Sequence, residues 1–348
     1  PYVMQATIQD LLRMATPHDA TTYTEKDAEW AKTFFHTQPT HLPGTIFAYN
    51  SSATTVLVAV VERITGGTLF SFLQRKLLQK IGFSQDIRCI ETPEGAAWGA
   101  SGLICTLRDI ALVGQLLMQG GSWNGEQLIS KEFVKAATSK QIDNRETGYA
   151  GYGYHIWCLP HRGFQIYGMG SQYVFCYPDV GLLFACMGDT QLAGPRAGAV
   201  INECVEALYE AAKENSSAAC EDEQHELVQR LKGLAIQPVS GSISDQQAAI
   251  IDGTWYTLHE NPMHIEALRI SFDANAGIFA YKKNGTILSI RFGLGRLVED
   301  EFPERYFGIR IGTASERGYR CLSSAAWVEP MHLQILVHSV DDHLGSLC

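Results

Sequence analysis

The sequence has no long hydrophobic run. Its longest apolar stretches, 56–61 and 182–187, are far shorter than the roughly 20 apolar residues that a helix needs to cross a bilayer. We therefore expect no transmembrane segment in the 348 residues. Hydrophobic residues still make up 46% of the chain, enough to bury the cores of two domains.

Positive charge is also scarce. The chain has 27 Lys and Arg residues against 37 Asp and Glu residues, a formal net charge of −10, and no basic cluster. Recognition of a nucleic-acid backbone depends on clustered Lys and Arg residues. We therefore expect no nucleic-acid partner, and the sequence leaves the oligomeric state open.

Closely spaced cysteines and cofactor motifs are missing as well. The nine Cys residues include no Cys-x-x-Cys pair, and their odd number does not suit a closed disulfide framework. This usage favours the cytoplasm. The chain also has no phosphate loop, no dinucleotide fingerprint and no zinc motif of correct spacing, so we expect no metal and no organic cofactor. It begins at Pro1 without Met, so we expect a piece of a longer protein, and an upstream export signal stays open.

The most informative stretch is 43–52, PGTIFAYNSS, which leads into an apolar run at 53–64. Pro-Gly indicates a turn, and from Ser52 the apolar positions recur at helical spacing. Tyr49 and Ser51 should therefore lie where a loop becomes a helix. The free N–H groups and the dipole of a helix N-terminus favour a phenolate, which could act as a base. The alternative is that Ser51 or Ser52 is only an N-cap and Tyr49 a half-buried aromatic residue.

This stretch resembles a known active-site element. Residues 44–51, followed by ERITG at 62–66, are similar to the second active-site element of serine β-lactamase-like hydrolases, which include class C β-lactamases, D,D-peptidases and family VIII esterases. The family has Tyr-x-Asn here, or Tyr-x-Ser in some amidase-like members. The resemblance covers about 7–212 and implies that Tyr49 assists proton transfer. It also implies that Ser51 hydrogen-bonds the substrate amide or the catalytic Lys.

The segment 168–172, GMGSQ, resembles the third element of the same family, a Lys-Thr-Gly or His-x-Gly on a strand edge. By resemblance Met169, Gly170, Ser171 and Gln172 contact the substrate, and the backbone N–H of Gln172 is an oxyanion donor. Met169 replaces the cation of the family, so a substrate carboxylate finds no charged partner at this position. The alternative is a Gly-rich hairpin with a structural role only.

The first element of the family, Ser-x-x-Lys, is absent from the chain. A spacing of three brings the Lys amine against the Ser hydroxyl on a helix, whereas Ser130-Lys131 and Ser139-Lys140 are adjacent pairs. We therefore expect the nucleophile upstream of Pro1 and no activity from this chain alone. By resemblance the protein is a serine hydrolase that forms an acyl-enzyme on esters, amides or D-amino-acid peptides. The alternative is a catalytically silent protein whose cleft binds a peptide or cell-wall fragment.

Periodicity predicts an α/β (α+β) fold in which helices surround an antiparallel sheet, at 1–213. The expected helices include 27–36, 68–81 and 197–213. Runs rich in aromatic and β-branched residues predict the sheet strands at 152–159, 164–168, 172–177 and 182–188.

The rest of the chain changes character. Residues 214–249 are rich in Asn, Ser, Glu and Gln and predict a linker with a possible short helix at 221–231. Alternating patterns then predict a small β-rich accessory domain at 250–348, with a final strand expected to be missing. Its expected strands are 254–259, 268–272, 278–282, 287–292, 306–311 and 333–338.

Overall fold

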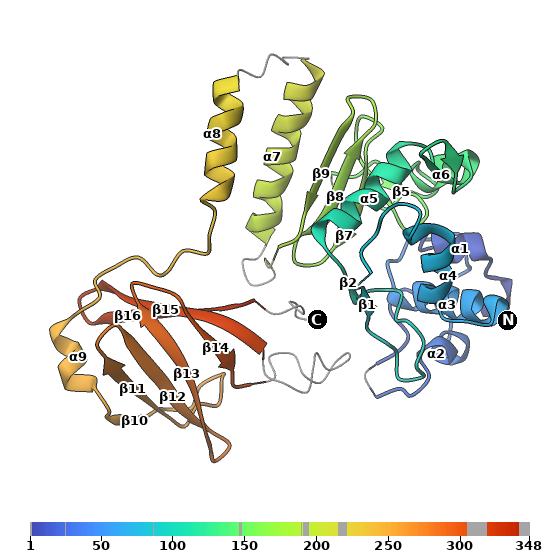
Figure 1. Ribbon diagram of the computed structural model, residues 1–348. Helices are drawn as coiled ribbons and strands as arrows, with labels where there is room; N and C mark the ends of the chain where they lie inside the picture. Colours follow the sequence, from blue (N-terminus) through green and yellow to red (C-terminus); the bar gives the residue numbers. More distant parts are fainter. Residues whose placement is uncertain are drawn as a thin grey trace. The chain divides into compact units, whose positions relative to one another are not determined.

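The protein forms two compact units, of which the first consists mainly of Pro1–Ser217 and the second of Ala218–Gly308 and Thr313–Ser346. Both units are seen in a computed structural model of the protein (Figure 1). The structure describes residues 2–24, 26–85, 87–145, 148–188, 190, 195–214, 221–304 and 319–340.

The first unit begins with helices and continues into a five-stranded sheet. Its helical segments are η1 (Val3–Gln5), α1 (Ile8–Leu12), α2 (Trp30–His36), α3 (Ser51–Thr65), α4 (Leu69–Leu73), η2 (Gln74–Leu78), α5 (Leu107–Met118), α6 (Lys131–Ala137) and α7 (Pro195–Lys213). Two short hairpins pair β1 (Arg88–Cys89) with β2 (Leu103–Ile104), and β3 (Ser122–Trp123) with β4 (Glu126–Gln127). The main sheet contains β5 (Gly151–Tyr152), β6 (Trp157–Cys158), β7 (Phe164–Gly168), β8 (Gln172–Tyr177) and β9 (Leu182–Cys186), paired antiparallel in that order.

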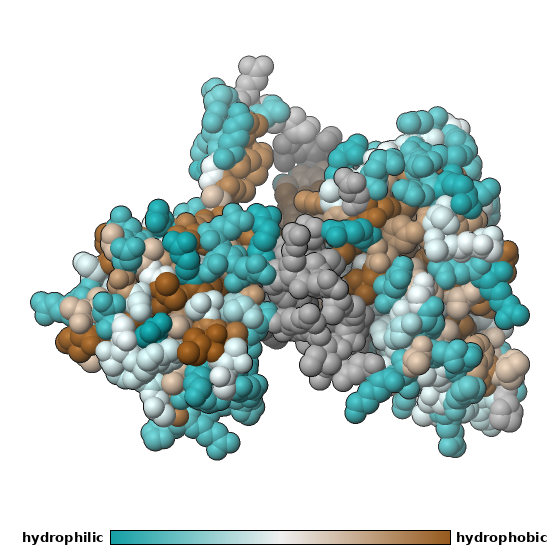
Figure 2. All heavy atoms as spheres, turned by 60° about the horizontal axis from the view of Figure 1, so that its bottom comes forward, coloured by the Kyte–Doolittle hydropathy of each residue, from teal (hydrophilic) through white to brown (hydrophobic). Residues whose placement is uncertain are grey.

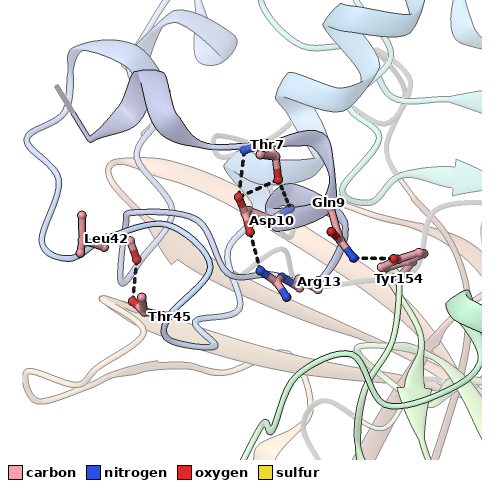
Figure 3. Close-up of polar contacts among 7 residues, drawn as sticks. All are labelled: Thr7, Gln9, Asp10, Arg13, Leu42, Thr45 and Tyr154. Carbon is pink, nitrogen blue, oxygen red and sulfur yellow. Dashed lines mark hydrogen bonds and ion pairs between the residues drawn. The ribbon is translucent and has the colours of Figure 1, made fainter.

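Side-chain hydrogen bonds fix where α1 begins and tie it to the sheet (Figure 3). The Thr7 hydroxyl accepts from the backbone N–H of Asp10 at 3.2 Å, and the Asp10 carboxylate accepts from the backbone N–H of Thr7 at 2.9 Å. This reciprocal pair satisfies two N–H groups of the first turn. Gln9 donates at 2.9 Å to the hydroxyl of Tyr154, which lies in the loop between β5 and β6.

Helices cover both faces of the main sheet. Because neighbouring strand residues point to opposite faces, Val174 and Cys176 pack toward α5, whereas Tyr173, Phe175 and Tyr177 pack toward α7. The contacts that α5 makes with β8 and β9, and α7 with β9, agree with this arrangement. The layered α/β prediction is confirmed.

The largest differences from the predicted bounds in the first unit concern three elements. The predicted helix at 27–36 begins only at Trp30, because the Asp27 carboxylate accepts from the Thr24 N–H at 2.6 Å and closes a separate turn. The predicted helix at 68–81 changes at Gln74 into a π-helical turn, which keeps Leu78 and Ile81 in one core. The predicted strand at 152–159 is two strands, since the chain turns back at His155 with a φ of 57°.

The described residues of the second unit form the helices α8 (Glu221–Lys232) and α9 (Gln246–Ile251) and a seven-stranded sheet. The strands are β10 (Trp255–Thr257), β11 (Ala267–Asp273), β12 (Ala276–Lys283), β13 (Thr286–Leu294), β14 (Val298–Phe302), β15 (Tyr319–Glu329) and β16 (His332–Ser339). The order is β10-β11-β12-β13-β15-β14, and β16 pairs with β15. Phe292, Leu294 and Ala325 lie at the centre of its core.

The short helix predicted at 221–231 and the β-rich second part are confirmed. The sequence did not predict α9, β14 or β15, and the strand predicted at 306–311 lies outside the described residues. Val239 and Ser242, both in the predicted linker, hydrogen-bond to Ser324 and Trp327 of β15. This part of the predicted linker therefore belongs to the second unit and is bonded to its sheet.

Surface and composition agree with an ordinary globular chain in each unit. Apolar and hydrophilic side chains are mixed over the face shown in Figure 2. In the described part of the chain, no single helix has the length and apolar content to cross a membrane. Helix α3 and the helical segment 69–78 have that length and composition only when taken together, and the pair is bent by 67°. The seven described cysteines are free thiols.

Candidate active site

Helix α3 is capped by Asn50, whose side chain is buried. Its Oδ1 accepts from the N–H of Ala53 at 3.1 Å, and its Nδ2 donates to the Thr16 hydroxyl at 2.9 Å and to the Ala48 carbonyl at 3.1 Å. The N-cap is therefore Asn50, and neither Ser51 nor Ser52 as the alternative prediction had it. Tyr49 precedes the cap and lies at the loop-to-helix junction, as the sequence predicted.

The ring of Tyr49 lies against aromatic residues of the sheet. It stacks on Trp157 of β6 with ring centroids 6.0 Å apart, and it meets Tyr152 of β5 edge to face at 6.4 Å. Trp157 in turn contacts Tyr167 of β7, again at 6.0 Å. Half of the Tyr49 surface remains exposed, at 50%. Tyr49 is thus held by packing while part of it stays open to solvent or to a bound molecule.

The electrostatic surroundings of Tyr49 favour its neutral form. Burial against the rings raises the pKa of the Tyr49 phenol, and the nearby Tyr167 raises it further. This direction is opposite to the expectation that the helix N-terminus would favour a phenolate. The catalytic role of Tyr49 stays a prediction, but the group is a neutral phenol near neutral pH.

Ser51 faces a different environment from Tyr49. Its backbone N–H donates to the Thr21 hydroxyl at 3.0 Å. Its side chain faces the phenol of Tyr23, which accepts from the indole N–H of Trp98 at 2.7 Å. Burial raises the pKa of Tyr23, although the hydrogen bond from Trp98 acts in the opposite direction. The side chain of Ser51 therefore faces the helical part of the unit.

The segment 168–172 is the turn between β7 and β8, and its backbone is left-handed at Gly170 and Ser171, with φ of 75° and 70°. Ser171 is only 1% exposed, and its hydroxyl lies 2.6 Å from that of Thr190. The Gln172 amide donates to the carbonyls of Gly170 at 3.1 Å and Gly188 at 2.5 Å. Both polar side chains of the turn are therefore used within the protein.

Met169 is the exposed side chain of this turn, at 49%. It follows Tyr167 by two residues, and Tyr167 is itself 42% exposed. The ring contacts from Tyr49 through Trp157 to Tyr167 bring the helix junction near the β7 end of the turn. The contribution of the Gln172 N–H and of Gly170 to an oxyanion site stays a prediction.

The aromatic partners of Tyr49 were not predicted from the sequence. Trp157 and Tyr167 lie on one face because Trp157 pairs with Gln165, which is two residues before Tyr167 on β7. The sequence shows that the predicted sheet contains aromatic residues, but the face of the sheet on which each one lies depends on the strand register. For a metal, the described residues offer no group of three or more His, Cys, Asp or Glu side chains.

The chain is similar in sequence to a known hydrolase. The chain is 30% identical over 133 residues to the 6-aminohexanoate-dimer hydrolase of Paenarthrobacter ureafaciens, a match that covers 36% of this chain and 34% of the relative. It spans about a third of the length of that relative.

Two solved structures are among those to which the chain is similar. A penicillin-binding protein from Bacillus halodurans is 17% identical with a TM-score of 0.42, over 58% of this chain and 72% of the other. The octameric penicillin-binding protein homologue from Pyrococcus abyssi is 13% identical with a TM-score of 0.42, over 96% of this chain and 77% of the other.

The family model named Beta-lactamase matches residues 4–199, which is more than half of the chain. The match includes the helix junction with Tyr49 and the turn with Met169, the two segments on which the sequence resemblance rests. The chain therefore belongs to the beta-lactamase family of hydrolases.

Proposed function

We propose that this chain forms part of the active-site cleft of a serine hydrolase that makes an acyl-enzyme from amides, esters or D-amino-acid peptides. The observation that carries the proposal is the half-exposed phenol of Tyr49 beside Trp157 and Tyr167, because segments more than 100 residues apart meet around one polar group. The relative from Paenarthrobacter is named for hydrolysis of an amide-linked dimer, which supports amides among these substrates.

In this proposal the nucleophile and its Lys come from outside the 348 residues. The nucleophile attacks the carbonyl carbon, the Lys takes the proton of the nucleophile, and the leaving group departs with a proton. A neutral phenol is suited to deliver that proton, and Tyr49 recovers one from the Lys. Backbone N–H groups at the start of β8 would stabilise the oxyanion, with Gln172 as the expected donor.

A second candidate is a binding protein without catalysis. Two observations favour it: the Ser51 side chain faces Tyr23, and Met169 occupies the position where the family has a cation. Such a protein would hold a peptide or cell-wall fragment against the same rings.

The test compares this chain with the longer protein that includes upstream residues, using 4-nitrophenyl acetate and a D-alanyl anilide. We expect hydrolysis only from the longer protein. In that protein Tyr49→Phe should lower kcat about 10²-fold to 10⁴-fold, because general acid–base catalysis contributes roughly this much. Tyr154→Phe, which removes a hydroxyl that accepts from Gln9, is the matched control and should retain activity.

Two results would contradict the proposal. Equal activity of the short chain, abolished by Ser51→Ala, would show that the nucleophile lies within the 348 residues. Tight binding of peptides without turnover by the longer protein would favour the binding protein.

A further inference from the structure

Three rings in contact, and a thioether two residues after the last of them, make up what we call the aromatic surface: Tyr49, Trp157, Tyr167 and Met169. Three of these residues are strongly exposed, Tyr49 at 50%, Met169 at 49% and Tyr167 at 42%. Ring contacts of 6.0 Å join Tyr49 to Trp157 and Trp157 to Tyr167. Exposed rings that touch one another are unusual on a surface without a binding role.

The aromatic surface is rigid. Tyr167 stacks on the buried Tyr173 with ring centroids 5.0 Å apart. The turn that follows Tyr167 is held by the hydroxyl of Ser171, which lies 2.6 Å from that of Thr190. Tyr167 is therefore held in place before any ligand arrives, and a ligand that packs on it loses little affinity to ordering of the protein.

The polar groups beside the aromatic surface are already satisfied. The side chains of Ser171 and Gln172 bond to Thr190 and to two backbone carbonyls of the protein. In the described part of the chain, the electrostatic influences on Tyr49 come from burial and from Tyr167, with no cation among them. A carboxylate placed beside Tyr167 and Met169 would lose its hydration without gaining a charged partner from the described residues.

We infer that the aromatic surface binds the apolar acyl or alkyl chain of an uncharged amide or ester, and that it selects against substrates with a carboxylate at this place. This inference rests on the proposed function for the reacting bond but concerns the part of the substrate beside it. The thioether of Met169 and the ring of Tyr167 offer the polarizable contacts that such a chain prefers.

The test measures binding by calorimetry, without any need for turnover, using butanamide, octanamide and the monoamide of adipic acid. A fully buried CH₂ group strengthens binding about fourfold. For a chain that lies on a surface and is half covered, we expect about twofold per CH₂, so octanamide should bind roughly tenfold or more tighter than butanamide. The adipic monoamide should bind more weakly than octanamide.

Substitutions then localise the effect. Met169→Lys should weaken octanamide and strengthen the adipic monoamide, each by several-fold, because it supplies the missing cation. Tyr167→Ala should remove most of the dependence on chain length. The control is Ile64→Lys, which adds the same charge at a residue 79% exposed near the other end of α3, about 20 Å along the helix, and should change neither affinity.

The outcomes separate this inference from the proposed function. Hydrolysis of 4-nitrophenyl esters by the longer protein without any dependence on chain length, or on Met169 and Tyr167, would overturn the inference and leave the function standing. Binding that depends on chain length, without hydrolysis of any ester or amide, would support the inference and contradict the proposed function. Octanamide binding by the 348-residue chain that disappears in the longer protein would show that the protein covers the aromatic surface with its own residues, and would also overturn the inference.

Discussion

Acidification should destabilise the first unit through His155. This residue lies in the loop between β5 and β6, where its backbone N–H donates to the Leu12 carbonyl at 2.8 Å and its Nδ1 lies 3.3 Å from the Thr54 hydroxyl. Its Nε2 is buried without a hydrogen-bond partner among the described residues. A charged imidazole would therefore disturb the place where the sheet meets α1 and α3.

The magnitude follows from the pKa. Burial lowers the pKa of His155 from 6.5 to about 4, and the Leu11 backbone offsets only part of this effect. Because the folded pKa is below the unfolded one, the unfolded chain binds the extra proton. Stability is full above about pH 6.5 and is lost as the pH falls toward 4. The loss is about 2 kcal/mol at pH 5 and on the order of 3 kcal/mol below pH 4.

Calorimetric melting at pH 7.5 and pH 5 measures this loss. A change of about 2 kcal/mol corresponds to roughly 4–8 °C in the Tm of a unit this size. Asn tolerates the left-handed backbone at this position and does not titrate. On acidification from pH 7.5 to pH 5, the Tm of His155→Asn should therefore fall by roughly 4–8 °C less than the wild-type Tm. His161→Asn is the matched control, since His161 has the same backbone conformation with φ of 56° but an exposed side chain. The Tm of His161→Asn should fall between pH 7.5 and pH 5 by as much as the wild-type Tm.

The burial of His18 lowers its pKa as well, so some acid sensitivity should persist in His155→Asn. The reasoning would be refuted if His155→Asn and the wild type lost the same Tm on acidification. That result would mean that the buried imidazole is hydrated or rearranges before it is protonated.

Three further predictions follow from the same structure. Fluorescent penicillin should label the longer protein much more slowly than a known penicillin-binding protein, because the turn of 168–172 has no cation for the carboxylate; labelling at equal speed would contradict this. Limited proteolysis should cut first within 233–237, which is exposed and precedes the hydrogen bonds to β15, and should leave a stable β-rich fragment; a first cut inside β11–β13 would contradict a separable domain. Gly153→Ala should destabilise the first unit by about 2–3 kcal/mol, since its Cβ would lie 1.9 Å from the Ala137 carbonyl oxygen. The control Gly125→Ala has free space and should lose only about 1 kcal/mol in chemical unfolding, owing to its φ of 83°.

The sequence predicted the layers of the first unit because their signals are local. Strands β7 and β8 have the bounds predicted for them, since aromatic and β-branched residues cluster there between turns. The residues that surround Tyr49 could not be predicted, because contacts such as Tyr49 to Trp157 depend on how helices pack on the sheet and on which face each residue takes. A shift of one position would move Trp157 to the other face.

Strand β15 was missed for a different reason. Its central residues Cys321, Ser323, Ser324, Ala325 and Ala326 are small and fully buried. Neighbours flank the strand on both sides, β13 and β14 on one and β16 on the other. Ser and Ala carry little β-propensity, so a pattern based on branched and aromatic residues passes over such a strand.

The two influences on Tyr49 can be weighed against each other. A helix N-terminus stabilises a negative charge by about 0.3–1 kcal/mol when its N–H groups are free. Here two of those groups are already bonded, the N–H of Ser51 to Thr21 and that of Ala53 to Asn50. Burial and Tyr167 act in the other direction and prevail, since the pKa of Tyr49 is raised. A phenol in this state can pass a proton but cannot remove one unaided, so a hydrolase built on this site needs a separate base, which is the role that the proposed Lys would fill.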